Sequence, residues 1–91
     1  MTVLHGRFKL GQVVTTRGAM EAMKRLNVNP VELFLPHVRG DWGDLDEEDK
    51  KENEFSVLRR LRILSAYKVR DEKFWLITEA DRSATTILLP D

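Results

Sequence analysis

The chain of 91 residues contains no cysteine, and this absence excludes two ways of holding a small domain together. Neither a disulfide framework nor a thiolate zinc site can form, so the fold depends on its hydrophobic core alone. A domain without disulfides suits a reducing compartment, and we therefore expect a cytoplasmic protein.

Long apolar runs are also missing. No stretch approaches the roughly 18 apolar residues of a membrane span, and residues 1–7 lack a charged segment followed by an apolar one. The sequence predicts a soluble, unprocessed chain with no membrane partner. With 42% hydrophobic and 33% charged residues the composition is that of a globular protein. Because a chain this short supports one core, we expect a single domain over residues 1–91.

A net charge of either sign is absent, since 15 basic residues balance 15 acidic ones. The charges are nevertheless sorted along the chain. Residues 1–40 carry six basic against two acidic groups, residues 41–54 two against eight, residues 57–73 six against two, and residues 74–91 one against three. A general nucleic-acid binder usually has a basic excess, so this balance favours a protein partner.

The first half of the chain predicts one strand and two helices. Residues 8–15 alternate imperfectly and predict a strand with Phe8 and Val14 on one face. Thr16 is a suitable N-cap for a helix over residues 17–27. A second helix starts from Asn29 as N-cap with Pro30 at its first position and Glu32 in a capping box, and Pro36 should kink or shorten it. Its expected buried stripe comprises Val31, Phe34, Leu35 and Val38.

The second half predicts one helix and three strands. Asp44 or Asp46 can cap a third helix that runs to about Arg60 and is buried through Phe55 and Leu58. Residues 61–69, 74–78 and 85–89 read as consecutive antiparallel strands. The fold class is therefore α+β, in the order β-α-α-α-β-β-β, with a mostly antiparallel sheet and the helices packed on one face.

The first candidate binding site is an acidic loop at residues 40–44, in which Trp42 lies between two glycines. Tryptophan is enriched in binding hot spots, but a loop tryptophan also serves as a lid over the core. The polar turn at residues 79–86 either joins this loop in one patch or forms an Asx turn with a threonine ladder. The candidate binding residues are Asp41, Trp42, Asp44, Asp81, Arg82 and Thr85.

A basic stripe is the second candidate and would contact nucleic acid. Its residues are Arg59, Arg60, Arg62, Lys68 and Arg70, with Tyr67 interleaved. Arg62, Lys68 and Arg70 share one face of the predicted strand and suit phosphate contacts. The alternative is that they pair with the acidic third helix. Tyr67 itself is expected to face Trp75 as a cross-strand pair.

Catalytic and metal sites find little support in the sequence. His5 and His37 are too few and too far apart for a metal site, and we expect both to be exposed. Residues 41–49 lack the spacing of a calcium loop. Ser56, Ser65 and Ser83 have no glycine-elbow context and no obvious histidine–acid partner. An acid cluster of Asp41, Asp44 and Asp81 would need to converge in a cleft. We therefore expect no enzyme, no cofactor and no metal.

Three segments resemble a family of small bacterial proteins that are often encoded on plasmids or other mobile elements. They are GDWGDLDEED (40–49), RILSAY (62–67) and ITEADRSATTILLP (77–90), and LGQVV (10–14) also matches. Members carry names such as "plasmid-related protein" or "type I restriction endonuclease subunit M". Arg17 departs from the family, which usually has proline there.

The methyltransferase activity that the second family name implies does not fit this chain. An adenine methyltransferase needs a glycine-rich turn and an Asn-Pro-Pro-aromatic loop, and residues 29–32 lack the second proline and the aromatic. Residue pattern and resemblance together predict a non-enzymatic protein-interaction module of a mobile element, or alternatively a nucleic-acid-binding accessory protein that uses the basic stripe.

Overall fold

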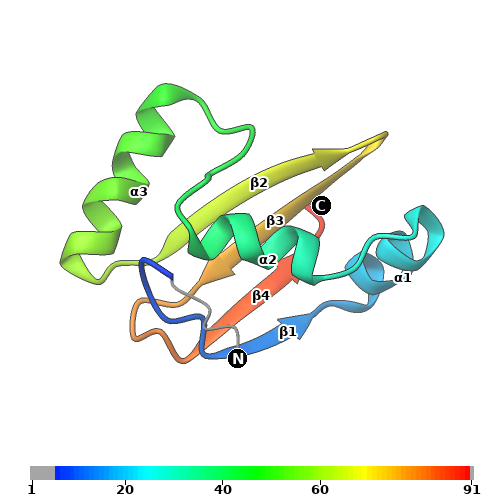
Figure 1. Ribbon diagram of the computed structural model, residues 1–91, viewed down its shortest axis with the longest axis horizontal. Helices are drawn as coiled ribbons and strands as arrows, with labels where there is room; N and C mark the ends of the chain where they lie inside the picture. The colour runs from blue at the N-terminus through cyan, green and yellow to red at the C-terminus, as the bar shows by residue number, and fades with distance from the viewer. Residues whose placement is uncertain (1–5, 91) are drawn as a thin grey trace.

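Seven elements follow one another in the predicted order, and they confirm an α+β fold (Figure 1). The computed structural model describes residues 6–90. The strands are β1 (Gln12–Thr15), β2 (Ile63–Val69), β3 (Glu72–Thr78) and β4 (Ala84–Leu88), and the helices are α1 (Arg17–Leu26), α2 (Val31–Val38) and α3 (Glu47–Arg59).

The strands form one mixed sheet in the order β1-β4-β3-β2. Strands β2, β3 and β4 are an antiparallel meander, as predicted, and β1 pairs in parallel with β4. β1 is shorter than the expected strand over residues 8–15. Gly11 has a φ of +65°, and a Cβ there would collide with the Ser83 carbonyl oxygen. The chain therefore turns at Gly11, and Phe8 lies outside the strand.

The hydrogen bonds predicted at the starts of α1 and α2 are present, although α2 begins at Val31, one residue later than expected, with Pro30 at the cap position. The Thr16 hydroxyl accepts a hydrogen bond from the Ala19 amide at 3.3 Å. The Glu32 carboxylate accepts from the Asn29 amide at 2.8 Å, and the Asn29 side chain accepts from the Val31 amide, which together close a capping box. α2 is short, as Pro36 predicts, and ends at Val38.

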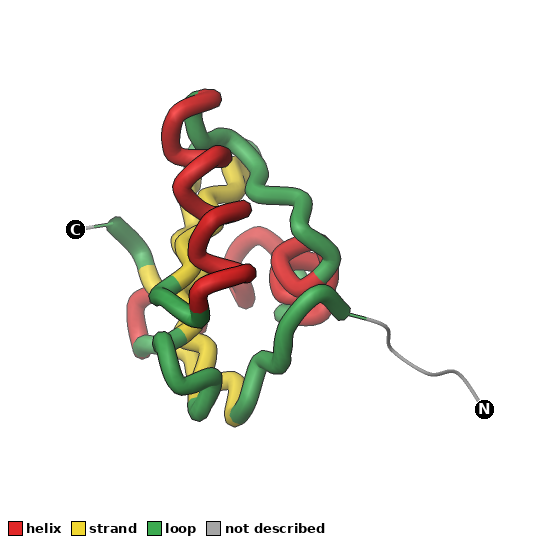
Figure 2. Tube along the Cα trace, turned by 90° about the vertical axis from the view of Figure 1, so that its left-hand side faces the viewer, coloured by secondary structure: helices red, strands yellow, loops and turns green. Residues whose placement is uncertain are grey.

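The main core lies on one face of the sheet, which we call the core face. α2 lies over this face, and α1 lies at one end of the sheet (Figures 1 and 2). Both helices supply apolar side chains to a single cluster with β3 and β4. The cluster comprises Ala19, Ala22, Met23, Leu26, Leu33, Phe74, Leu76 and Ile87. Leu33 is part of it, whereas Val31, which was expected in the stripe of α2, is 46% exposed.

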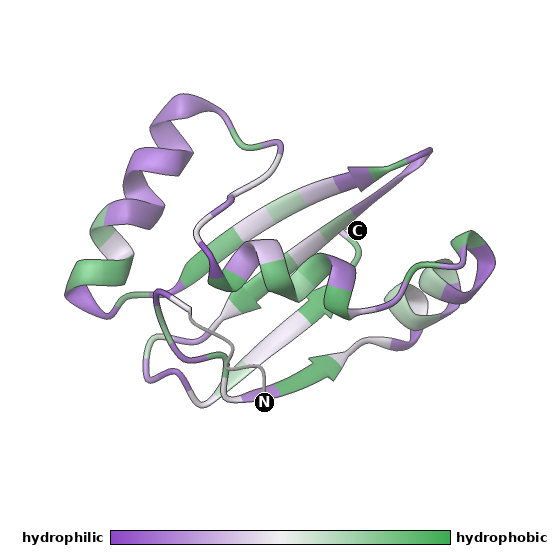
Figure 3. Ribbon diagram, viewed as in Figure 1, coloured by the Kyte–Doolittle hydropathy of each residue, from purple (hydrophilic) through white to green (hydrophobic). Residues whose placement is uncertain are grey.

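Helix α3 lies beside the edge strand β2 (Figure 1). The Asp46 side chain caps it by accepting from the Asp49 amide at 2.8 Å, which confirms one of the two predicted caps. The expected burial through Phe55 and Leu58 is wrong, because these side chains are 49% and 81% exposed. The helix buries Asn53 and Ser56 instead. Figure 3 shows the consequence, since most of α3 is hydrophilic while the strands alternate.

Candidate functional site

A chain of polar groups runs through the core beneath α2. His37 is completely buried, and its ring nitrogens contact the Ser65 hydroxyl at 2.5 Å and the Thr78 hydroxyl at 2.8 Å. Thr78 is within 2.7 Å of Thr85, whose hydroxyl donates to the Leu10 carbonyl at 2.8 Å. Every buried polar side-chain atom of this network therefore has a hydrogen-bond partner.

One expectation from the sequence is wrong at this place, because His37 is not exposed. Ser65 contacts a histidine, but no carboxylate of residues 6–90 completes a histidine–acid pair. The pair is not an activated nucleophile, because Ser65 is inaccessible and the second ring nitrogen faces Thr78 rather than a carboxylate. Burial lowers the pKa of His37 to about 4, so the ring is neutral at pH 7. His5 lies outside the described residues.

Trp42 is a lid over the core rather than a surface anchor. Its side chain is 4% exposed, and the indole N–H donates to Glu54 at 2.9 Å. The Arg7 guanidinium donates to both oxygens of Glu54, at 2.8 and 2.6 Å, and lies over the indole ring. These donors, Arg7 first, lower the pKa of Glu54 to about 2. Glu54 therefore ties the acidic loop to α3.

The acidic loop covers the outer edge of β2. The Ala66 amide donates to the Trp42 carbonyl at 3.2 Å, and the Asp44 amide donates to the Ala66 carbonyl at 2.6 Å. The Asp44 carboxylate accepts from the Lys68 amide at 2.7 Å, and the Asp41 carbonyl accepts from the Tyr67 hydroxyl. The loop backbone and the Asp44 carboxylate thus pair backbone groups that a bare edge would leave free.

Arg82 and Thr85 are also buried, which overturns their expected place in a surface patch. Arg82 is 8% exposed, and its guanidinium donates to four backbone carbonyls, those of Ser56, Leu61, Glu79 and Ala80. Phe8 stacks 6.2 Å from Trp42 and lies 5.7 Å from the Arg82 guanidinium. Phe8, which was expected in a strand, therefore links Trp42 and Arg82 from within.

Asp81 forms the predicted Asx turn, in which its carboxylate accepts from the Ser83 amide at 3.0 Å. Ser83 lowers the pKa of Asp81, whose side chain is fully solvated. This shift favours the ionised carboxylate and is opposite to the raised pKa typical of a general acid. Within residues 6–90, no group of three or more histidines, aspartates or glutamates is arranged to hold a metal ion.

The residues of the basic stripe are scattered. The Arg59 guanidinium lies over the Phe55 ring, and Arg60 is the left-handed cap that ends α3. Arg62 pairs with Glu79 at 3.2 Å, not with the acidic third helix as one alternative held. Lys68 is exposed on β2, and Arg70 lies in the turn to β3. The stripe residues therefore belong to the end of α3, to β2 and its flanks, and to the turn before β3.

The sheet face opposite the core, which we call the open face, has no helix over its middle (Figure 2). Two rows of neighbours across the strands define it, Val14, Thr86, Ile77 and Leu64 in one row and Leu88, Trp75 and Ala66 in the other. Tyr67 pairs with Phe74 rather than Trp75, so the expected Tyr67–Trp75 pair is wrong. The two aromatic rings point to opposite faces because neighbouring register positions alternate.

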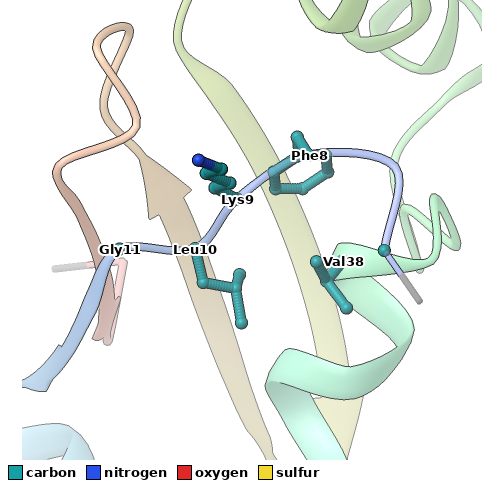
Figure 4. Close-up of a pocket in the computed structure, with 6 residues that line it drawn as sticks. Phe8, Lys9, Leu10, Gly11 and Val38 are labelled. Carbon is teal, nitrogen blue, oxygen red and sulfur yellow. The ribbon is translucent and has the colours of Figure 1, made fainter. Parts of the chain in front are cut away.

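A groove of about 560 Å³ lies between the segment before β1 and the end of α2 (Figure 4). Leu10 and Val38 extend toward the same side, while the Lys9 amine points away from them. The lining is mostly apolar and offers no second charged side chain. The groove therefore lacks the converging polar groups that a small-molecule site needs.

Comparison with known proteins adds no family to these observations. No family model, curated protein or solved structure matches the chain. Among the described residues, no helix is both long and apolar enough to cross a membrane.

Proposed function

We propose that this protein is a non-enzymatic protein-binding module that binds its partner through the open face of the sheet. The observation that carries the proposal is a mostly apolar row, Val14, Thr86, Ile77 and Leu64, which lies next to Trp75 and has no helix over its middle. Val14, at the β1 end of the row, is 39% exposed. Uncovered apolar surface of this kind is typical of interaction sites.

The charges beside the open face indicate the chemistry of the partner. Lys68 and Lys73 are direct cross-strand neighbours, both exposed, at one end of this face. Like charges directly opposite one another destabilise a sheet, and a carboxylate placed between them would relieve the repulsion. We therefore expect a protein partner with an apolar centre and an acidic group that lies over the two lysines.

The interior supports binding rather than catalysis. The polar groups that chemistry would need, His37, Glu54 and Arg82, are held by partners within the protein. The charges and hydrogen-bonding groups of these side chains thus hold the loops and the sheet edge in place. The resemblance to proteins of plasmids and mobile elements extends the proposal to a cytoplasmic role in a bacterial cell that carries such an element.

Site-specific photo-crosslinking in the native host tests the proposal. Benzoylphenylalanine replaces Leu64 or Leu88 on the open face, and in matched controls it replaces Met20 on α1 or Leu58 on α3, which are 47% and 81% exposed. We expect both open-face positions to capture the same protein. The Lys68→Glu/Lys73→Glu variant should reduce that product at least about tenfold. Equal capture from all four positions, or indifference to the lysines, would overturn the proposal.

Nucleic-acid binding is the second candidate function. The observation that favours it is the position of Lys68 and Lys73 near the exposed part of Trp75, which resembles a stacking platform beside a basic groove. It requires retardation of single-stranded DNA or RNA that weakens steeply as salt rises. If the open-face crosslinks are nuclease-sensitive, this function replaces the protein-binding one.

A further inference from the structure

The outward side of helix α3 carries an exposed apolar centre. Phe55 and Leu58, which are three positions apart in this helix of 13 residues, are 49% and 81% exposed. Asn53 and Ser56 are buried on its other side, toward the sheet. Figure 2 looks at the outward side, and α3 lies there in front of the sheet with no segment of residues 6–90 over it. We call this side of the helix the α3 face.

A hollow of about 400 Å³ lies on the α3 face beside the Phe55 ring. It is lined by Glu48, Lys51, Glu52 and Phe55, which occupy positions i, i+3, i+4 and i+7 of the helix. Four residues at this spacing form the hole that receives one side chain of a facing helix when helices pack by knobs into holes. The shape of the α3 face therefore suits a protruding side chain on another helix.

Leu58 of a second copy supplies such a side chain. It is the most exposed large apolar residue of α3, and it follows the hole on the same face. If two α3 helices pack antiparallel, Leu58 of each copy enters the hole of the other. Phe55 lies midway between hole and knob in the sequence, so the two Phe55 rings meet near the two-fold axis. The Lys51 methylenes can then cover the seated leucine while its amine stays in water.

The charges on the α3 face match those of a second copy in this orientation. Glu48, Glu52 and Arg59 lie on one flank, because they are four and seven positions apart. Within residues 6–90 none of the three has an ion-pair partner. With Leu58 seated, Arg59 of each copy lies level with the gap between Glu48 and Glu52 of the other. Parallel packing would instead bring carboxylates together at one end and guanidiniums at the other.

We propose that two copies of this protein form an antiparallel dimer through the α3 face, with Leu58 of each copy in the four-residue hole of the other. A helix of this length spans about 20 Å, so the interface belongs with the small, reversible ones. The dimer therefore dissociates at the low micromolar concentrations used for unfolding measurements, which concern the monomer. The inference goes beyond the proposed function and does not rest on it, because the open face is a different surface.

Sedimentation equilibrium of the purified full chain tests the dimer over concentrations from about 5 to about 500 μM at low salt. We expect the mean mass to rise from 10.6 kDa toward twice that value. Leu58→Ala should raise the dissociation constant at least about tenfold, whereas Met20→Ala, at a residue of α1 that is 47% exposed, should leave it unchanged. A single-chain mass at every concentration would overturn the inference, and so would a dimer that Leu58→Ala leaves intact.

An exchange of charges tests the antiparallel orientation. Arg59→Glu alone and Glu48→Lys/Glu52→Lys alone should each stay monomeric, because like charges then meet across the two-fold axis. An equimolar mixture of the two variants should dimerise again, which excludes misfolding as the cause of the loss. Arg17→Glu, the same charge change at a side chain of α1 that is 94% exposed, should dimerise like the unaltered chain. A mixture that stays monomeric, or single variants that dimerise normally, would refute the orientation and with it the inference.

The outcomes distinguish this inference from the proposed function. Benzoylphenylalanine at position 58 should crosslink to a second copy of this chain, and not to the protein captured from Leu64 or Leu88. A dimer without capture at the open face supports the inference and contradicts the proposed function. Capture at the open face by a chain that stays monomeric at every concentration does the reverse.

Discussion

Single side chains hold distant parts of this protein together through polar contacts within a mostly apolar core. His37 joins α2 to β2 and β3, and Arg82 joins the turn after β3 to the end of α3. Such contacts are weak when both partners can return to water, but costly when one partner is removed and the other stays buried. Replacing one of these few side chains should therefore destabilise the protein strongly, because its partner stays buried.

His37 makes the stability of the protein sensitive to acid. Its pKa in the folded state is about 4, below the value of about 6.5 in an unfolded chain. The unfolded state therefore binds the extra proton first, and stability is fully present above pH 6.5 and is lost as the pH falls toward 4. The loss should reach about 2 kcal/mol at pH 5 and about 3 kcal/mol below pH 4. Urea unfolding at pH 7, 6 and 5 measures it. In His37→Gln, the slope between pH 6.5 and 5 should largely disappear.

Arg82→Met should destabilise the protein by about 3 kcal/mol, because four carbonyls lose a charged donor in a part-buried setting. Asp81→Ala in the same turn is the control. It removes one exposed hydrogen bond and should cost less than about 1 kcal/mol. Denaturant midpoints compare the two, and similar losses would contradict the role assigned to Arg82.

Helix α3 differs from α1 and α2 in what attaches it. The two earlier helices bury apolar side chains in the main cluster, while α3 is attached through Asn53, Ser56 and Glu54. A helix attached mainly by hydrogen bonds depends on their geometry rather than on apolar area. It also leaves Phe55 and Leu58 exposed.

Asn53→Asp should destabilise the protein by about 2 kcal/mol, since a carboxylate accepts from the Leu64 amide but repels the Leu64 carbonyl. Leu58→Ala on the same helix should change stability by less than about 0.5 kcal/mol, because the leucine is 81% exposed. Urea midpoints give both values. Hydrogen exchange of the Leu64 amide should accelerate only in the Asn53 variant, and unchanged protection would refute its role at the edge.

The whole molecule is asymmetric about its sheet. One face lies under α2 and the other is open. One edge is covered by the acidic loop and Asn53, while the outer edge of β1 is not covered by any of residues 6–90. The surfaces that remain available are therefore contiguous, from the edge of β1 across the open face to Lys68 and Lys73. A partner that binds there can satisfy backbone, apolar and charged groups together.

Lys73→Glu should stabilise the free protein and weaken its interaction. The change replaces a like-charged cross-strand pair with an ion pair and should add about 0.5 kcal/mol. Lys68→Glu should act alike, while the double variant restores a like-charged pair and loses the gain. Thermal unfolding of the three variants measures this cycle, and additive effects in the double variant would exclude direct coupling.

Signals that span a few residues were readable from the chain alone. The capping box of Asn29 and Glu32, the Asp46 cap and the Asx turn of Asp81 each join groups two or three positions apart. The order of the seven elements follows from such local patterns and from hydrophobic period, so the α+β fold was predictable. The burial of His37 had one local signal, its place four residues after the buried Leu33.

The fate of the candidate site residues depended on contacts far apart in sequence. Trp42 meets Glu54 twelve positions away, Arg82 meets Leu61 at 21 and His37 meets Ser65 at 28. Such partners come together only when strands and helices assemble, and no spacing in the chain encodes them. Composition and local pattern therefore determined which elements form. The tertiary structure determined which polar side chains are buried with partners inside the protein and which surface stays exposed for a partner. The physical reason is that burial depends on the packing of the whole molecule.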